Sequence, residues 1–101
     1  EPLPASPYGA SKIAAEAFVK TYSELYGLKT SCLRYFSVYG PRQRPDLAIA
    51  KFTKNILAGK PIEMFGNGSS MRDYTFISDA VQGTLAALNK KFNFERFLYN
   101  L

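Results

Sequence analysis

Tyr8 and Lys12 stand four positions apart in the stretch SPYGASK, residues 6–12, with only small residues between them. Side chains four positions apart on a helix lie on the same face, about 5–6 Å apart at Cβ. A free tyrosine has a pKa near ~10, and a nearby ammonium group stabilises the phenolate and lowers that pKa. Such a pair could accept a proton from a hydroxyl group while another group accepts a hydride. The alternative is a packed tyrosine beside a solvated lysine, because this four-residue pattern alone is weak evidence.

The element that must position this pair is a helix. Ser6 is a good N-cap, Pro7 suits the first helical position and Gly27 is a natural end. One face of the predicted helix carries a stripe of residues at helical spacing, which are Ile13, Ala14, Ala17, Phe18, Thr21, Tyr22 and Leu25.

The rest of the chain alternates predicted strands and helices. Residues 29–40 read as a strand that runs into a loop, 61–65 as a short strand before a turn, and 96–101 as a final strand. Asp46 is predicted to cap a helix over roughly 47–58, closed by Gly59, and a third helix is predicted from Ser78 or Asp79. Its apolar face comprises Ile77, Val81, Leu85 and Leu88. This alternation predicts an α/β fold with parallel pairing, and three short strands suggest a piece of a larger protein.

Composition excludes several classes of function. The net charge is +5, but the basic residues are scattered, which favours a solvated surface over a nucleic-acid partner. The chain has no histidine, so His-dependent triads are excluded and no metal site is expected. No run of about 20 apolar residues is present, so no membrane partner is expected. Cys32, the single cysteine, reads as a buried inert thiol in a reducing compartment, and we expect the cytoplasm.

Two longer stretches carry a resemblance to a known family. SPYGASKIAAE resembles the active-site helix of the extended short-chain dehydrogenases/reductases, specifically the NAD-dependent nucleotide-sugar epimerases and dehydratases. LRYFSVYGPRQRPDLAIAKFTKNILAGKPIEMFGNGSSMRDYTFISDAVQGTLAAL resembles the second half of those enzymes almost without gaps. Within the family, GPRQRPDLAI is most similar to the UDP-glucuronate 4-epimerases.

The resemblance implies part of a Rossmann-like parallel sheet that lacks its N-terminal βαβ half, together with elements of the small substrate-binding domain. Residues 1–40 would form the end of the NAD-binding domain with the active-site helix. Residues 41–101 would form a substrate-binding region mixed with returning Rossmann elements. The glycine-rich pyrophosphate loop, and the Ser/Thr that completes the catalytic trio, would precede residue 1. The GNG at 66–68 is not that loop, because no third glycine stands at the required spacing.

The resemblance also assigns cofactor-binding roles. In this family NAD takes a hydride from C4 of the sugar, and the 4-keto intermediate is then reduced on its other face. Tyr8 matches the proton-shuttling tyrosine, and Lys12 matches the lysine that bonds the nicotinamide ribose and tunes the tyrosine. Tyr35 and Phe36 match residues that line the nicotinamide pocket. The alternative for these two residues is ordinary core aromatics.

Four residues match substrate-binding positions. Ser37 stands where many relatives carry Asn and glucuronate epimerases carry Thr, and its hydroxyl could bond the sugar or its carboxylate. Arg44 matches a residue that faces the substrate carboxylate, although a solvated loop arginine is equally expected. Phe65 matches a residue near the uracil, and Arg72 matches the arginine that binds the diphosphate.

The leading function is therefore a piece of an NAD-dependent UDP-sugar 4-epimerase, of the UDP-glucuronate or UDP-glucose type, inactive by itself. A dehydratase is less favoured, because Ala5, Ser6 and Pro7 precede Tyr8 where dehydratases carry an acidic pair. A non-catalytic binding domain that retains the scaffold is the alternative from another class. The resemblance implies as partners the UDP-sugar, the missing N-terminal half and a second subunit, bound through the first helix as a homodimer. Burial of the helix's apolar stripe against its own domain is the alternative to that dimer.

Overall fold

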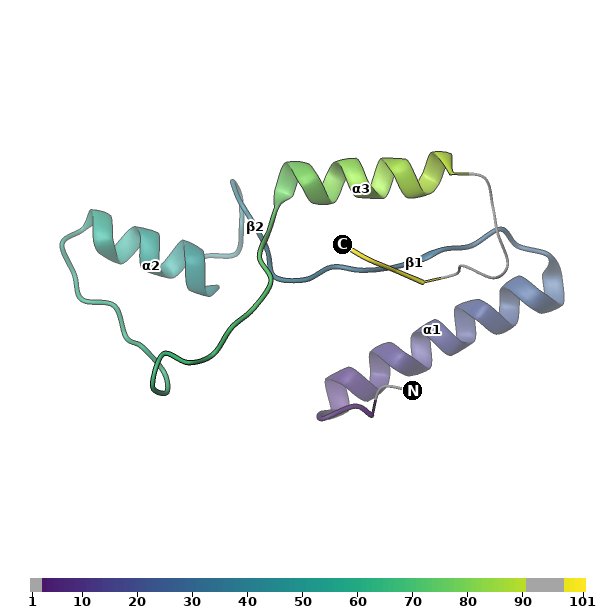
Figure 1. The fold of residues 1–101 in the computed structure, drawn as a ribbon, viewed down its shortest axis with the longest axis horizontal. Coiled ribbons are helices and arrows are strands. Elements are labelled where there is room, and N and C mark those ends of the chain that lie inside the picture. The colour runs from purple at the N-terminus through teal and green to yellow at the C-terminus, as the bar shows by residue number, and fades with distance from the viewer. Residues whose placement is uncertain (1–2, 91–97) are drawn as a thin grey trace. The chain divides into compact units, whose positions relative to one another are not determined.

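A computed structural model describes residues 3–90 and 98–101 of this protein. The elements are α1 (Pro7–Tyr26), β1 (Cys32–Arg34), β2 (Val38–Tyr39), α2 (Ala48–Leu57), β3 (Thr75–Phe76), α3 (Ile77–Asn89) and β4 (Leu98–Asn100), shown in Figure 1. They divide into two compact units: the first runs to Arg34 and includes β4, and the second is Tyr35–Leu88 with Leu101. The expected division into NAD-binding and substrate-binding parts at residue 40 stays a prediction.

Helix α1 of the first unit begins and ends where its caps predict. The Ser6 hydroxyl accepts a hydrogen bond of 3.1 Å from the backbone N–H of Gly9, and Pro7 occupies the first turn. Gly27 ends the helix in the left-handed conformation with φ of 66°, which glycine adopts without steric cost. The predicted helix is therefore confirmed. It was predictable because residues next to its two ends determine where it begins and ends.

The strand of the first unit pairs in parallel with the last strand of the chain. Cys32 pairs with Leu98 and Arg34 with Asn100, as the α/β alternation predicts. The final predicted strand, 96–101, is confirmed for Leu98–Asn100, and residues 96 and 97 lie outside the described residues. The strand predicted within 29–40 is confirmed as β1, but the loop expected after it contains a second short strand, because the backbone bends at Ser37, which has a positive φ of 39°. The segment therefore forms two short strands, β1 and β2.

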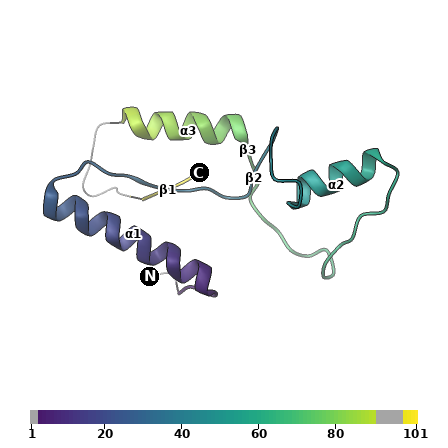
Figure 2. The same cartoon turned by 180° about the vertical axis from the view of Figure 1, so that it is seen from behind.

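An ion pair fastens α1 to β1, which run alongside each other in both ribbon views (Figure 2). The Arg34 guanidinium donates two hydrogen bonds of 2.7 Å to the Glu16 carboxylate, one to each oxygen. This bidentate geometry fixes the direction of both side chains. The hydrogen bonds from Arg34 lower the pKa of Glu16 below its ordinary value.

The second unit is built on the parallel pair β2 and β3. Val38 pairs with Thr75 and Tyr39 with Phe76, and β3 leads directly into α3. The strand predicted at 61–65 is wrong, because these residues are irregular and Phe65 is 82 % exposed. A strand needs a partner for its ladder, and the partner of β2 is β3 instead. The predicted third helix is confirmed, although it begins at Ile77 rather than at Ser78 or Asp79.

Helix α2 differs from its prediction at its start. Leu47 is the N-cap and makes no side-chain capping bond, so the predicted cap by Asp46 is wrong. The Asp46 carboxylate instead accepts a hydrogen bond of 2.6 Å from the Arg44 side chain. Gly59 follows the helix with φ of 66°, as predicted for its closing glycine.

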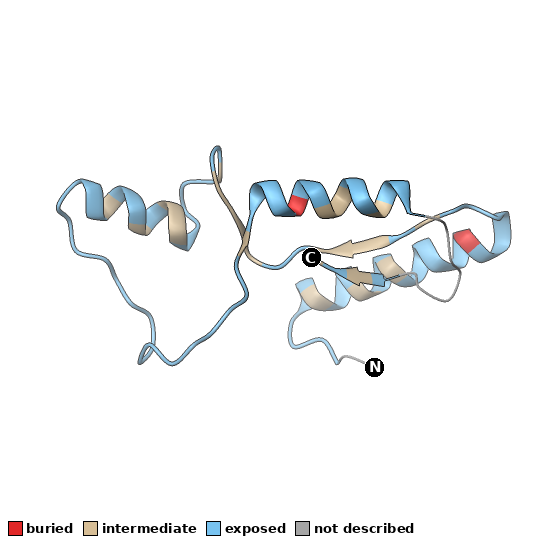
Figure 3. Ribbon diagram, turned by 45° about the horizontal axis from the view of Figure 1, so that its top comes forward, coloured by how far each residue is buried: buried red, intermediate tan, exposed pale blue. Residues whose placement is uncertain are grey.

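The more buried positions of α1 and α3 are mostly small or polar residues, and Ile13 is the one large member of the two apolar stripes among them. Figure 3 shows one buried position on each helix, which are Ser23 on α1 and Ala80 on α3. The other large apolar side chains of the predicted stripes are exposed within their units: Phe18, Tyr22 and Leu25 on α1, and Ile77, Val81, Leu85 and Leu88 on α3. Among the described residues, no helix has both the length and the apolar character needed to span a bilayer.

Replacing Gly40 with alanine should destabilise the second unit. Gly40 has φ of 147°, and an added Cβ would lie 2.6 Å from Cγ2 and 3.1 Å from Cβ of Ile77. Because these atoms are close to the backbone of α3, the start of that helix must shift. We expect a loss of about 2 kcal/mol in the free energy of unfolding, measured by urea denaturation of the longer protein.

Gly59→Ala is the matched control, because Gly59 also has a positive φ of 66° but no atom lies within 4 Å of an added Cβ. It should lose only about 1 kcal/mol, the cost of the left-handed conformation alone. Equal losses for the two variants would show that the Ile77 contact is unimportant.

The Glu16–Arg34 ion pair should make stability depend on acid pH. Because the folded-state pKa of Glu16 is lowered, its contribution is present above the unfolded pKa, near 4.5, and is lost as pH falls through the folded value. Glu16→Gln should therefore lower the melting temperature at pH 7, and the difference from wild type should shrink below about pH 4.5. Glu24→Gln, an exposed position of the same helix, is the control. If the difference in melting temperature between wild type and Glu16→Gln stays constant down to about pH 3, the Glu16–Arg34 ion pair is not the source of the pH dependence.

Candidate active site

Lys12 lies over the ring of Tyr8 in the first turns of α1. The Lys12 ammonium nitrogen is 5.4 Å from the centroid of the phenol ring, so the prediction that both side chains share a face is confirmed. Tyr8 is 72 % exposed, and the phenol is therefore open to a ligand. A cation at this distance from an aromatic ring is attracted to the face of the ring.

The Tyr35 hydroxyl is bonded to α3. The Thr84 hydroxyl donates to the carbonyl oxygen of Ala80 at 2.7 Å, so its single proton is committed and Tyr35 must donate to it, at 2.6 Å. Phe36 is exposed, and its backbone N–H donates to the Leu101 carbonyl at 3.0 Å. The expected positions of Tyr35 and Phe36 against a nicotinamide stay predictions.

Cys32 of β1 has the properties of a structural thiol. Partial burial raises its pKa, and the neighbouring Glu16 carboxylate raises it further. A thiol with a raised pKa is mostly protonated at neutral pH and is a poor nucleophile. Within the described residues, no group of three His, Cys, Asp or Glu side chains could hold a metal ion.

The second unit contains a pocket of about 350 Å³, at the lower end of the range for ligand sites. It brings together Ser37 and Arg72, two of the four residues predicted to bind substrate. The bend at Ser37 separates β1 from β2 and places this residue at the pocket wall. The complete lining is Ser37, Val38, Tyr39, Gln43, Leu47, Ala48, Ile49, Arg72 and Tyr74.

The other two predicted substrate residues are not part of this lining. Arg44 is 71 % exposed at its side chain and pairs with Asp46, whose pKa the Arg44 hydrogen bond lowers. Phe65 lies on the irregular segment that was predicted to be a strand, and it makes little contact. The assignment of both residues to the substrate stays a prediction.

Sequence reasoning missed Gln43, Tyr39 and Tyr74. The rings of Tyr39 and Tyr74 meet edge to face with centroids 6.4 Å apart, and both residues line the pocket. One signal could have indicated Tyr39: it ends a parallel strand, the edge at which α/β proteins bind ligands. Nothing comparable marks Gln43, whose side chain bonds to backbone.

The known proteins to which this chain is similar in sequence and structure include several UDP-sugar 4-epimerases. A UDP-glucuronate 4-epimerase of Thermodesulfobacterium geofontis is 52 % identical over 85 residues, which are 84 % of this chain and 26 % of the relative. The structure of UDP-glucuronic acid 4-epimerase from Bacillus cereus, in complex with UDP-glucuronic acid and NAD, matches with a TM-score of 0.88 and 43 % identity, covering 99 % of this chain and 32 % of that one. The structure of UDP-glucose 4-epimerase from Thermotoga maritima, with UDP-glucose, matches with a TM-score of 0.89 and 39 % identity. The match covers 99 % of this chain and 32 % of that one.

The chain thus spans about a third or less of the length of these relatives. Over that part the predicted Rossmann-type α/β architecture is confirmed by the likeness to the solved epimerases. All of residues 1–101 match the description of a single family. The chain belongs to the NAD dependent epimerase/dehydratase family.

Proposed function

We propose that this chain is the part of an NAD-dependent UDP-sugar 4-epimerase that carries the proton-transfer pair and a wall of the substrate pocket, with UDP-glucuronate as the leading substrate. The observation that carries the proposal is the position of the Lys12 ammonium over the exposed Tyr8 phenol. The names of the relatives support the substrate class, because UDP-glucuronate and UDP-glucose epimerases recur among them.

Each unit offers an exposed aromatic side chain that suits a nicotinamide cofactor. Tyr8 is open at its phenol, and Phe36 presents an exposed aromatic side chain. In the proposal, Lys12 and Tyr8 hold the nicotinamide ribose, while Tyr35 and Phe36 line the ring and exclude water. NAD, when bound, supplies a hydride acceptor that later returns the hydride.

Tyr8 performs the proton transfer in this proposal. The Tyr8 phenolate accepts the proton of the sugar's 4-hydroxyl as the C4 hydride leaves, which produces a 4-keto sugar. After the keto sugar turns over, Tyr8 returns the proton to the oxygen as the hydride returns to the opposite face. Lys12 stays over the Tyr8 ring throughout, and no net oxidation of the sugar results.

The pocket of the second unit would hold the rest of the substrate. Arg72 is suited to pair with the diphosphate, because a guanidinium matches phosphate oxygens in two-pronged geometry. Ser37 would donate to the sugar or its carboxylate, and Phe65 would stack on the uracil. Arg44 would exchange its exposed pairing with Asp46 for the carboxylate of glucuronate.

The exposed apolar residues of α1 support a homodimer through this helix. Phe18 is 67 % exposed, and Tyr22 and Leu25 lie on the same face. Exposed apolar patches of this kind mark interaction surfaces. The cytoplasm is the proposed location, because a lone cysteine suits a reducing compartment.

Tyr8→Phe in the full-length protein should lower kcat for interconversion of UDP-glucuronate and UDP-galacturonate by about 10²–10⁴-fold. The phenyl ring keeps its contact with Lys12 but cannot carry the proton. Turnover is followed by separation of the two sugar nucleotides, and binding of UDP by calorimetry. Tyr26→Phe, an exposed tyrosine of the same helix, should keep wild-type turnover.

Undiminished turnover in Tyr8→Phe would remove Tyr8 from the mechanism. A wild-type protein that binds UDP but converts neither UDP-glucuronate nor UDP-glucose would favour the non-catalytic binding domain.

Phe18→Lys should convert the proposed homodimer to a monomer in sedimentation velocity. A charge on this face must be desolvated at an apolar interface, whereas the folded subunit loses little because Phe18 is already exposed. Glu24→Lys, on the same helix outside the stripe, is the control and should stay dimeric. A wild-type protein that sediments as a monomer at micromolar concentration would contradict the proposal.

A further inference from the structure

The loop beside the pocket contains three residues with positive φ within six positions. Ser37 has φ of 39°, Gly40 of 147° and Arg42 of 66°. For Ser37 and Arg42 this conformation costs about 1–2 kcal/mol each, because neither is glycine. Such a conformation persists only where other contacts hold it. The loop therefore needs a specific restraint.

Gln43 supplies two hydrogen bonds to this loop. Its backbone N–H donates to the Gly40 carbonyl at 3.2 Å and closes the turn. Its side-chain amide donates to the Val38 carbonyl at 3.2 Å and returns the loop to β2. Both bonds join Gln43 to the segment that contains the unusual backbone conformations.

The Val38 carbonyl lies on the edge of β2 away from β3. The preceding carbonyl, of Ser37, accepts from the backbone N–H of Thr75 at 3.3 Å, and successive carbonyls of a strand point to opposite edges. The ladder with β3 therefore leaves the Val38 carbonyl without a strand partner. The Gln43 amide takes the place of that partner.

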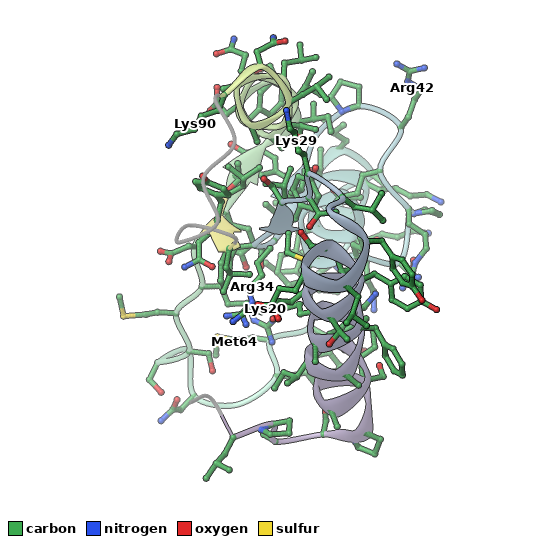
Figure 4. All side chains as sticks on the ribbon, turned by 90° about the vertical axis from the view of Figure 1, so that its right-hand side faces the viewer. Lys20, Lys29, Arg34, Arg42, Met64 and Lys90 are labelled. Carbon is green, nitrogen blue, oxygen red and sulfur yellow. The ribbon has the colours of Figure 1, made fainter. Side chains whose placement is uncertain are left out.

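Gln43 also belongs to the pocket lining. The pocket takes one wall from Ser37–Tyr39 and another from Leu47–Ile49 at the start of α2, and Gln43 stands between them in the chain. The adjacent Arg42 projects outward from the loop in Figure 4. The half-buried Gln43 side chain is thus placed to set the separation of the two walls.

We propose that Gln43 is a positioning residue of the sugar-nucleotide pocket, which acts by bonding the edge carbonyl of Val38 and so holding the β2 wall, with Ser37, against the start of α2. This inference rests on the proposed function, because it takes the pocket to be the UDP-sugar site. Without the amide donor the loop samples other conformations, and the apparent affinity falls by the fraction of time the pocket is unformed. At saturating substrate the bound UDP-sugar holds the loop in its pocket-forming conformation, so kcat is retained.

Gln43→Glu in the full-length protein tests this inference. The carboxylate keeps the shape of the side chain but offers no N–H and places an oxygen against the Val38 carbonyl. We expect the Kd of UDP, measured by calorimetry, and the KM of UDP-glucuronate to rise about tenfold, with kcat within about twofold of wild type. Gln43→Met, which removes the donor without adding a charge, should give the same KM-against-kcat split if Gln43→Glu folds poorly.

Gln82→Glu makes the same chemical change on α3 at an exposed position outside the pocket lining, and it should leave both constants unchanged. A lower melting temperature and a lower active fraction in both Gln43 variants, with unchanged Kd and KM, would overturn the inference and leave a purely structural role. Wild-type protein that fails to bind UDP would overturn this inference together with the proposed function. If wild-type protein binds UDP and both Gln43 variants bind it with the same Kd, this inference is overturned and the proposed function stands.

Discussion

The attraction between the Lys12 ammonium and the Tyr8 ring, one helical turn away, is the interaction on which the proposed chemistry depends. Lys12 and Tyr8 meet because both lie on one face of α1, and α1 begins where it does because Ser6 bonds the N–H of Gly9. Ser6 and Pro7 set the start of α1 one residue before Tyr8, so Tyr8 lies in the first turn and Lys12 in the second. The Ser6 cap therefore belongs to the architecture of the site, although it contacts neither side chain of the pair.

The Glu16–Arg34 ion pair joins α1 to β1 and so holds the helix against the sheet of its unit. Its two hydrogen bonds join the middle of the helix to the end of β1, on the side of α1 that faces its own unit. Phe18, Tyr22 and Leu25 of α1 remain exposed. The helix thus contacts its unit through its more buried positions, Gly9, Ile13, Glu16 and Ser23, of which only Ile13 belongs to the apolar stripe.

The sequence predicted what local interactions determine. The ends of α1 follow from Ser6, Pro7 and Gly27, and the turn at 66–68 follows from its glycines and from Asn67, whose side chain bonds the N–H of Ser69 at 3.0 Å. The strand predicted at 61–65 failed because strand formation depends on a distant partner, which β2 finds in β3. Asp46 failed as a cap because Arg44, two residues away, competes for its carboxylate.

The candidate site was likewise predictable only where its geometry depends on residues close together in the sequence. The spacing of Tyr8 and Lys12 is a local property and predicted their shared face, whereas the meeting of Ser37 and Arg72 in one pocket was expected only from resemblance. Gln43 escaped prediction because a side chain that bonds to backbone leaves no characteristic pattern in the sequence. The exposure of the α3 stripe was equally hidden, because periodicity identifies a face but not what covers it.

The parallel pairing of β1 with β4 has a consequence for synthesis on the ribosome. Cys32 pairs with Leu98, so the edge of β1 that receives β4 emerges long before its partner has been translated. At about 5–20 residues per second, that edge waits several seconds with free N–H and C=O groups. Nascent chains of this protein are therefore exposed to mispairing between neighbours on a polysome during this interval, and a chaperone that shields extended segments would act there.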